Sequence, residues 1–292
     1  MKKSLSEKIF QVFDIMLMVF IMSTIILPIM NIISVSFSST KAVNTNSVGL
    51  FPIGFQTVAY KKILTDSVFL RSLINTVFVT SVGTLLSVIV ITLAAYGLSK
   101  RFYGKKTITY FFIVTMYFSG GLIPTYLLVS KYLNMRDTLL AYMLPYLVNV
   151  FYLIVLRSQI ESLPPSLMES AHIDGANEYQ TLFMIVLPLL APTIAAVSMF
   201  IALNKWNMWF PVLLYSSKNE TWTLQYFLRA MVFDKVLAAM SNPEYNADPS
   251  DMTSPLNFQN ASIVLVAAPI VMIYPFVQKY FVKGIITGAV KG

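Results

Sequence analysis

Few residues of this 292-residue chain could perform acid–base or nucleophilic chemistry. His172 is its one histidine, it has no cysteine, and only 13 of its residues are Asp or Glu. A zinc site needs three or four ligands, and no H-E-x-x-H pattern occurs. The phosphate-binding pattern G-x-x-x-x-G-K-[ST] is also missing from the sequence. We therefore predict a chain that is not an enzyme, has no catalytic residue, and binds no metal or cofactor itself.

A second group of polar residues lies within strongly apolar sequence. Asn204, Lys205, Trp206 and Asn207 are consecutive. Amide, ammonium and indole groups together suit a hydroxyl-rich ligand, which needs polar partners beside flat apolar faces. The same residues would also suit the edge of a membrane, where tryptophan is enriched and lysine extends to water. Both interpretations stay open, and Tyr117 is a further candidate for a substrate pathway.

The composition places these residues in a membrane protein. The chain is 57% hydrophobic and 12% charged, with a mean hydropathy of +0.70, whereas about 25% of the residues of a soluble domain are charged. We predict an all-α integral membrane protein with a single transmembrane domain over residues 1–292. Stretches long enough to cross about 30 Å of hydrocarbon are 9–37, 72–98, 107–129, 138–156, 185–215 and 259–281. Tyr117–Pro124 should interrupt the third stretch, because Pro124 lacks an N–H donor and the glycines loosen the turn.

Basic residues indicate the orientation. The net charge is +8, and lysine and arginine gather at the amino terminus, in the loop between the second and third stretches, and in the carboxyl tail. Short loops rich in these residues stay on the cytoplasmic side. We therefore expect a multi-pass protein of a bacterial inner or cell membrane, with both termini on the cytoplasmic side. The charge indicates orientation among lipids and not a nucleic-acid partner.

The loop 157–184 departs from this pattern, because it is predicted to be cytoplasmic yet is acidic. It holds Glu161, Glu169, Asp174 and Glu178 against one arginine, which favours contact with a basic protein partner. Ser166 is expected to cap a short helix running to about His172, with Glu169 completing a capping box. Gly175 should end that helix. A second long loop, 216–258, is predicted to be external.

A motif in the acidic loop resembles a known family. Glu169-Ser170-Ala171, then Gly175, then Ile185-Val186-Leu187-Pro188 is similar to the E-A-A-x3-G-x9-I-x-L-P loop of permease subunits of binding-protein-dependent ABC importers. Ser170 replaces one alanine. The resemblance implies a type I importer fold with a cytoplasmic coupling helix. It assigns contact with an ATPase to Glu169, Ser170, Ala171, Asp174, Gly175 and Pro188.

Other segments resemble the carbohydrate-type members of this family. Trp206-Asn207 is similar to their fifth-span signature, and Val282–Gly292 to the tail of the smaller permease subunit of the maltose importer. The tail resemblance implies that Gly288, Lys291 and Gly292 contact the ATPase. Ser119–Leu128 resembles a subgroup assigned to complex oligosaccharides, including uronate-containing ones.

The resemblance implies an importer that moves a sugar or oligosaccharide into the cytoplasm. Its expected partners are a second, homologous permease subunit, two copies of an ABC ATPase that carry ATP and Mg, and an extracytoplasmic solute-binding protein. Two alternatives remain: a stand-alone channel or ion-coupled carrier, and a scaffold subunit without a pathway. The absence of a carboxylate deep within the apolar stretches argues against an ion-coupled carrier.

Overall fold

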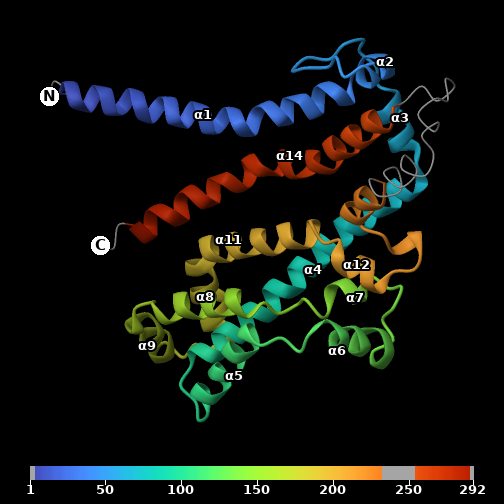
Figure 1. Ribbon diagram of the computed structural model, residues 1–292. Helices are drawn as coiled ribbons and strands as arrows, with labels where there is room; N and C mark the ends of the chain where they lie inside the picture. The colour runs from blue at the N-terminus through green and yellow to red at the C-terminus, as the bar shows by residue number, and fades with distance from the viewer. Residues whose placement is uncertain (1–3, 232–253, 290–292) are drawn as a thin grey trace. The chain divides into compact units, whose positions relative to one another are not determined.

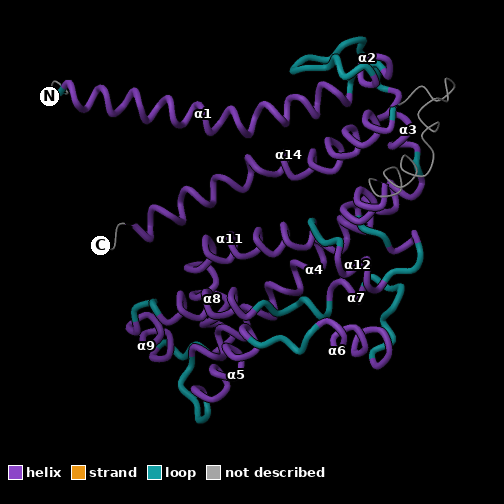
Figure 2. The backbone as a smooth tube through the Cα atoms, in the orientation of Figure 1, coloured by secondary structure: helices purple, strands orange, loops and turns teal. Residues whose placement is uncertain are grey.

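The computed structural model describes residues 4–231 and 254–289, and these residues form helices joined by loops (Figure 1). None of the described residues lies in a strand (Figure 2). The predicted all-α fold is therefore confirmed. The chain forms two compact units, one of Met1–Phe69 with Leu228–Pro269 and the other of Leu70–Phe227 with Ile270–Gly292.

The first unit contains a long apolar helix and a short polar cap of loops. Helix α1 (Leu5–Ser36) begins with a capping box in which Ser4 and Glu7 bond each other's backbone N–H groups. Helices α2 (Thr40–Asn44) and α3 (Val58–Thr65) follow. Helix α14 (Pro255–Ala289) starts here, where Asn257 donates to the carbonyls of Val35 and Ser38 at 2.7 and 2.8 Å.

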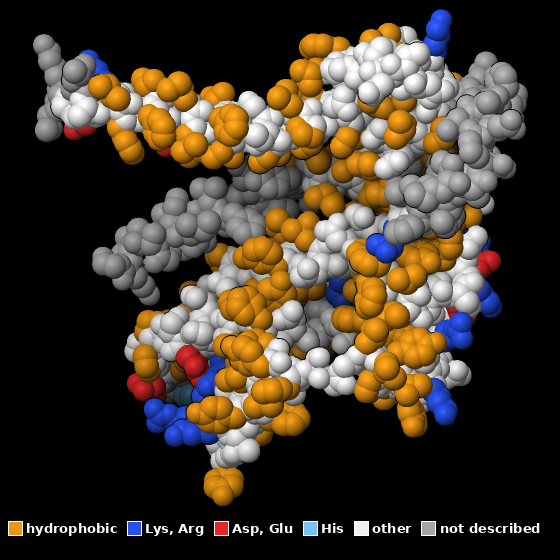
Figure 3. Space-filling model, viewed as in Figure 1, with side chains coloured by type: hydrophobic (Ala, Val, Ile, Leu, Met, Phe, Trp, Pro, Cys, Tyr) orange, Lys and Arg blue, Asp and Glu red, His pale blue; other side chains and the backbone are white. Residues whose placement is uncertain are grey.

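Hydrophobic side chains are spread along the visible face of α1 (Figure 3), and its large apolar residues from Ile9 to Ile29 are mostly exposed. Water would make such a surface costly, whereas lipid tails do not. The exposure is therefore that of a helix surrounded by lipid or by partner helices.

The second unit holds most of the helices. They are α4 (Ser67–Ser99, which begins in the first unit), α5 (Lys105–Tyr117), α6 (Leu122–Leu127), η1 (Leu128–Tyr132), α7 (Leu140–Met143), α8 (Val150–Glu161), α9 (Pro165–Ile173), α10 (Glu178–Gln180), η2 (Thr181–Val186), α11 (Leu187–Trp206), α12 (Phe210–Tyr215) and η3 (Asn219–Thr221). Its main core joins α4, α8 and α11 through Ile91, Leu153, Leu156, Leu190 and Ile201.

Four helices in the described part of the chain are long and apolar enough to span a membrane: Ser6–Ser36, Ser67–Ser99, Glu178–Trp206 and Pro255–Met272. A fifth span would be the pair Lys105–Tyr117 and Leu122–Tyr132, whose axes bend by 105° at their junction. The expected interruption is therefore confirmed, and Gly121 turns the chain there with φ +89°. The predicted count of six is not confirmed.

The fourth predicted span, 138–156, is not a continuous helix. Helix α7 ends at Met143, and α8 begins only at Val150, where the Asn149 side chain accepts a bond from the Phe151 N–H. Pro145 lies in the gap and cannot donate to a helical ladder. Hydropathy alone identified apolar sequence here but not the break.

The fifth predicted span, 185–215, begins earlier and is interrupted near its end. The helical segment starts at Glu178 and passes through the π-helix η2, which Pro188 follows. Because Pro188 has no N–H for the usual bond to the residue four positions before it, a widened turn precedes it. At the other end α11 stops at Trp206, and Pro211 lies in the first turn of the short helix α12.

Candidate functional site

Helix α9 forms the centre of the loop 157–184, and its first turn is set by two prolines. Pro164 occupies the N-cap and Pro165 the first helical position, without any side-chain cap bond. Proline suits this position because its missing N–H would be unpaired there in any case. The predicted cap at Ser166 is therefore wrong: Ser166 lies within the first turn, and no capping box with Glu169 forms.

The end of α9 follows the prediction, because Gly175 turns the chain away with φ +78°. The Gly175 N–H bonds the His172 carbonyl at 3.1 Å, and the Ala176 N–H bonds the Ala171 carbonyl at 2.9 Å. This pair of bonds is the Schellman motif, which satisfies carbonyls at a helix end. The helix is thus fixed at nine residues, and Asp174 forms its C-cap.

The two faces of α9 differ sharply. Ala171 is buried at 5% exposure, whereas Glu169, Ser170, Asp174 and Gly175 are exposed. Ile173 is 85% exposed, which is unusual for a side chain of this size. Within the described residues, the Glu169 and Asp174 carboxylates have no hydrogen bond or ion pair. The outer face of α9 therefore presents free negative charge together with an apolar side chain.

A first polar cluster holds the segment after α9 against the end of α4. Glu178 accepts a hydrogen bond from the Tyr96 hydroxyl at 2.5 Å and forms an ion pair with Lys100 at 2.7 Å. The Lys100 ammonium also lies over the Tyr96 ring, 4.4 Å from its centroid. His172 Nε2 is 3.9 Å from the same carboxylate. One carboxylate thus joins α4, α9 and α10.

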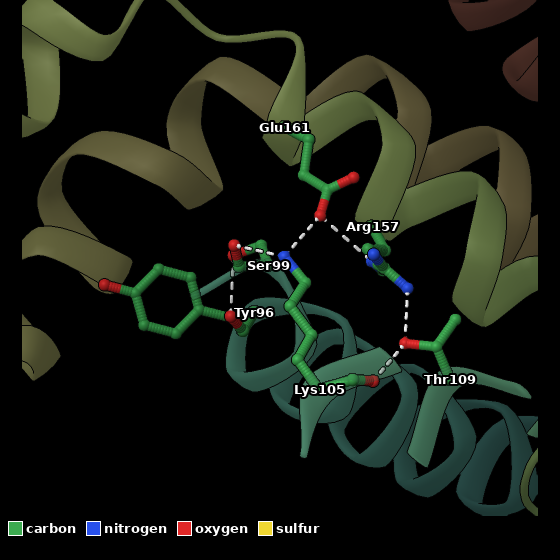
Figure 4. Close-up of polar contacts among 6 residues, drawn as sticks. All are labelled: Tyr96, Ser99, Lys105, Thr109, Arg157 and Glu161. Carbon is green, nitrogen blue, oxygen red and sulfur yellow. Dashed lines mark hydrogen bonds and ion pairs between the residues drawn. The ribbon is translucent and has the colours of Figure 1, made fainter. Parts of the chain in front are cut away.

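A second cluster holds the segment before α9 (Figure 4). Glu161 Oε1 accepts from Lys105 Nζ at 2.9 Å and from Arg157 Nε at 3.0 Å, and Arg157 donates to Thr109 at 2.8 Å. Lys105 also donates to the Ser99 carbonyl at 3.1 Å. Partial burial raises the pKa of Glu161, but the hydrogen bonds from Lys105 and Arg157 outweigh it, so the pKa lies below its ordinary value.

The acidic residues of this loop therefore divide into two pairs. Glu161 and Glu178 bind cations of the same chain, on either side of α9, whereas Glu169 and Asp174 lie on its surface with no partner among the described residues. Charged side chains gather beside α5 and α9 (Figure 3). The interpretation that the whole acidic loop faces a basic partner needs correction, because half of these carboxylates stabilise the loop itself.

A second candidate site is a cavity of about 320 Å³ inside the second unit. Its polar lining comes from Ser87, Tyr146, Asn149, Tyr152, Asn204 and Lys205. Asn204 donates to the Tyr152 hydroxyl at 3.2 Å. Sequence reasoning selected Asn204 and Lys205 but missed Asn149, Tyr146 and Tyr152, which are ordinary polar residues in apolar sequence. The spacing of Thr76, Thr80, Thr84 and Ser87 on one helix face was the available signal for Ser87.

The other candidate residues lie apart from this cavity. Trp206 is buried but does not line it, and Asn207 accepts a bond from Gln225 at 3.0 Å. Tyr117 is exposed at the end of α5. Pro188 is an exposed residue of the first turn of α11.

The tail residues are described only in part. Helix α14 continues through Gly288 to Ala289, whereas Lys291 and Gly292 lie outside the described residues. Among the residues that the structure covers, no group of three or more His, Cys, Asp or Glu side chains is placed to hold a metal ion.

These features define a class: an all-helical membrane protein with several apolar spans, a surface helix held by ion pairs, and a polar cavity between its helices. No family model matches the sequence. The chain is 38% identical to the polygalacturonan/rhamnogalacturonan transport system permease protein YtcP of Bacillus subtilis, over 91% of this chain and 93% of that protein. It is 37% identical to protein LplC of Bacillus subtilis, over 100% and 98% of the two chains.

Solved structures agree with this likeness. A chain from the crystal structure of a bacterial ABC transporter involved in the import of the acidic polysaccharide alginate matches with a TM-score of 0.86 and 31% identity, over 96% of this chain and 99% of that one. A chain of the alginate ABC transporter in complex with an alginate pentasaccharide-bound periplasmic protein shares the fold, with a TM-score of 0.62 and 18% identity.

This chain belongs to the carbohydrate permease subunits of ABC importers. The family that the Glu169–Pro188 motif indicated is therefore confirmed, as is a membrane protein of the bacterial inner membrane. A stand-alone channel or carrier and a scaffold subunit are not favoured by these likenesses.

Proposed function

We propose that this chain forms one half of the membrane pathway of an ATP-driven importer for an oligosaccharide. A second, homologous permease subunit would form the other half, and an external solute-binding protein would deliver the substrate. Two copies of an ABC ATPase would bind on the cytoplasmic side and hold ATP and Mg. Both termini and the loop 157–184 would lie in the cytoplasm, and the loop 216–258 outside.

The observation that carries this proposal is the arrangement of α9. A helix transmits a push only if it is short, rigid and attached to the spans that must move. The prolines and Gly175 fix its ends, and the Glu161 and Glu178 clusters attach its flanking segments to α4, α5 and α8. Its outer face keeps Glu169 free for basic groups of an ATPase and Ile173 for an apolar contact.

One relative and one structural neighbour of this chain support an acidic substrate. One relative transports polygalacturonan or rhamnogalacturonan, and one structural neighbour is involved in the import of the acidic polysaccharide alginate. We infer that this chain handles an oligosaccharide containing uronate residues.

The coupling role is tested by replacing Glu169 with lysine in the complete transporter. We expect Glu169→Lys to remove ATPase subunits from the purified complex and to abolish ATP-dependent oligosaccharide uptake in proteoliposomes, because the new cation repels a basic groove. Glu220→Lys is a matched control, since Glu220 is also an exposed carboxylate but lies in η3, far along the chain from the loop.

Two outcomes would contradict the proposal. Unchanged ATPase association and uptake in Glu169→Lys would remove α9 as the coupling element. Uptake by the wild-type chain without ATP or an ATPase would instead indicate a stand-alone carrier.

A further inference from the structure

Lys205 is a lysine buried within the described structure. It lies in the last turn of α11 and is only 3% exposed. Its ammonium has no hydrogen-bond partner and no carboxylate within ion-pair distance among the residues that the structure covers. A buried cation is costly unless it is paired, so the position favours a partner that the described residues do not supply.

The neighbouring helix is shaped to accept this side chain. A Cβ atom built on Gly83 of α4 would lie 2.9 Å from Lys205 Cδ and 3.2 Å from its Nζ. Any larger residue at position 83 would therefore displace the lysine. The hydroxyls of Thr84 and Ser87, which follow Gly83 on α4, are also buried without a partner. An ammonium and two hydroxyls therefore lie buried without a hydrogen-bond partner among the described residues of α4 and α11.

Two of these residues, Lys205 and Ser87, line the cavity of about 320 Å³. Its other polar groups are amides and phenols, from Asn149, Asn204, Tyr146 and Tyr152, and no Asp or Glu of the described residues contributes to the lining. The one formal charge is therefore positive. Amides and hydroxyls bind sugar hydroxyls, tyrosine rings offer flat faces for a pyranose, and the ammonium fits a carboxylate.

We propose that Lys205 binds the carboxylate of an acidic saccharide as it passes through this subunit. The inference rests on the proposed importer function and adds the residue that selects for charge. A neutral sugar would offer the ammonium only hydroxyl dipoles, whereas a uronate offers a full negative charge. Lys205 is then a specificity-determining residue of the pathway.

The test uses the complete transporter with its binding protein in proteoliposomes. The probes are tetragalacturonate, tetramannuronate and their methyl esters, which keep the shape and remove the charge. We expect Lys205→Met to lower uptake of the acids about tenfold or more, since a charge-assisted bond is lost. Uptake of the esters should change less than twofold, and Lys205→Arg should retain most acid uptake.

Gly83 supplies an independent variant that leaves the lysine in the chain. Gly83→Ala should lower acid uptake in the same direction as Lys205→Met, because the added methyl group displaces the ammonium. Gly97→Ala is its control on the same helix, since no heavy atom lies within 4 Å of a Cβ at that position. Co-purification of the partner subunits shows whether each variant assembles.

An equal loss of acid and ester uptake in Lys205→Met would overturn the inference, because the role of Lys205 would then not depend on the charge of the substrate. Unchanged acid uptake would overturn it too, while leaving the importer function intact. If the wild-type transporter moved neither the four probes nor any neutral oligosaccharide, the proposed function itself would fail.

Discussion

At the scale of single residues, the loop 157–184 depends on which of its carboxylates find a cation. Glu161 is shared by Lys105 and Arg157, which come from α5 and α8. Glu178 is shared by Tyr96 and Lys100 at the end of α4. Each pair is partly exposed, so its contribution is modest, but the bonded geometry fixes where the loop begins and ends.

The Glu161 pair predicts a pH-dependent stability. Because the pKa of Glu161 is lower in the folded protein than in the unfolded chain, its stabilisation is present at neutral pH and is lost as the pH falls through the folded-state pKa. We expect Glu161→Gln to lower the free energy of unfolding by less than about 1 kcal/mol at neutral pH. The difference from wild type should shrink on acidification, as thermal unfolding in detergent will show.

Glu169→Gln is the matched control for this measurement, because Glu169 lies on the same loop without a partner. Its unfolding temperature should follow that of the wild-type chain across the pH series. A constant difference between Glu161→Gln and wild type at every pH would show that the ion pairs do not stabilise the loop.

At the scale of elements, α9 is defined more by its ends than by its interior. The helix is too short to be stable in water by itself. Pro165 starts it, and Gly175 stops it in a left-handed conformation that L-residues with a Cβ adopt at a cost. No atom lies within 4 Å of a Cβ built on Gly175, so the cost of a substitution there comes from the backbone and not from crowding.

Because crowding plays no part at Gly175, Gly175→Ala tests only the backbone conformation at the end of α9. We expect a loss of about 1 kcal/mol in local stability, because alanine at this φ is strained. The amide protons of Gly175 and Ala176 should exchange faster with solvent, as hydrogen–deuterium exchange of the purified transporter would detect. Gly49→Ala is the control, since no heavy atom lies within 4 Å of a Cβ built on Gly49 and its φ is not positive. Unchanged exchange near α9 would contradict the prediction.

At the scale of the whole molecule, the distribution of basic residues predicts which ends face the cytoplasm. The chain contains no cysteine, so single cysteines can be introduced without further change. Lys8, Lys61 and Ser166 are exposed positions in α1, α3 and α9. We expect a membrane-impermeant maleimide to label Lys61→Cys in intact cells but Lys8→Cys and Ser166→Cys only after permeabilisation. The reverse pattern would overturn the orientation.

Much of this architecture is predictable from sequence, because it depends on local properties. Long apolar runs predict helices regardless of their neighbours, and the break between Tyr117 and Leu122 and the Gly175 turn follow from backbone chemistry within a few residues. The family motif lies within one loop. In contrast, the break between Met143 and Val150 escaped prediction, since apolar composition does not distinguish one helix from two short helices with a gap.

An all-helical membrane chain, its family and the loop that carries the motif were all predictable from the amino-acid sequence. The fold was needed to show that Glu161 and Glu178 pair within the chain while Glu169 has no partner among the described residues, that Lys205 packs against Gly83, and that Lys205 and Ser87 line one cavity. The two kinds of feature differ in how far apart along the chain their residues lie. Hydropathy and turns are properties of neighbouring residues, whereas ion pairs and cavities arise between residues that the fold brings together from separate helices.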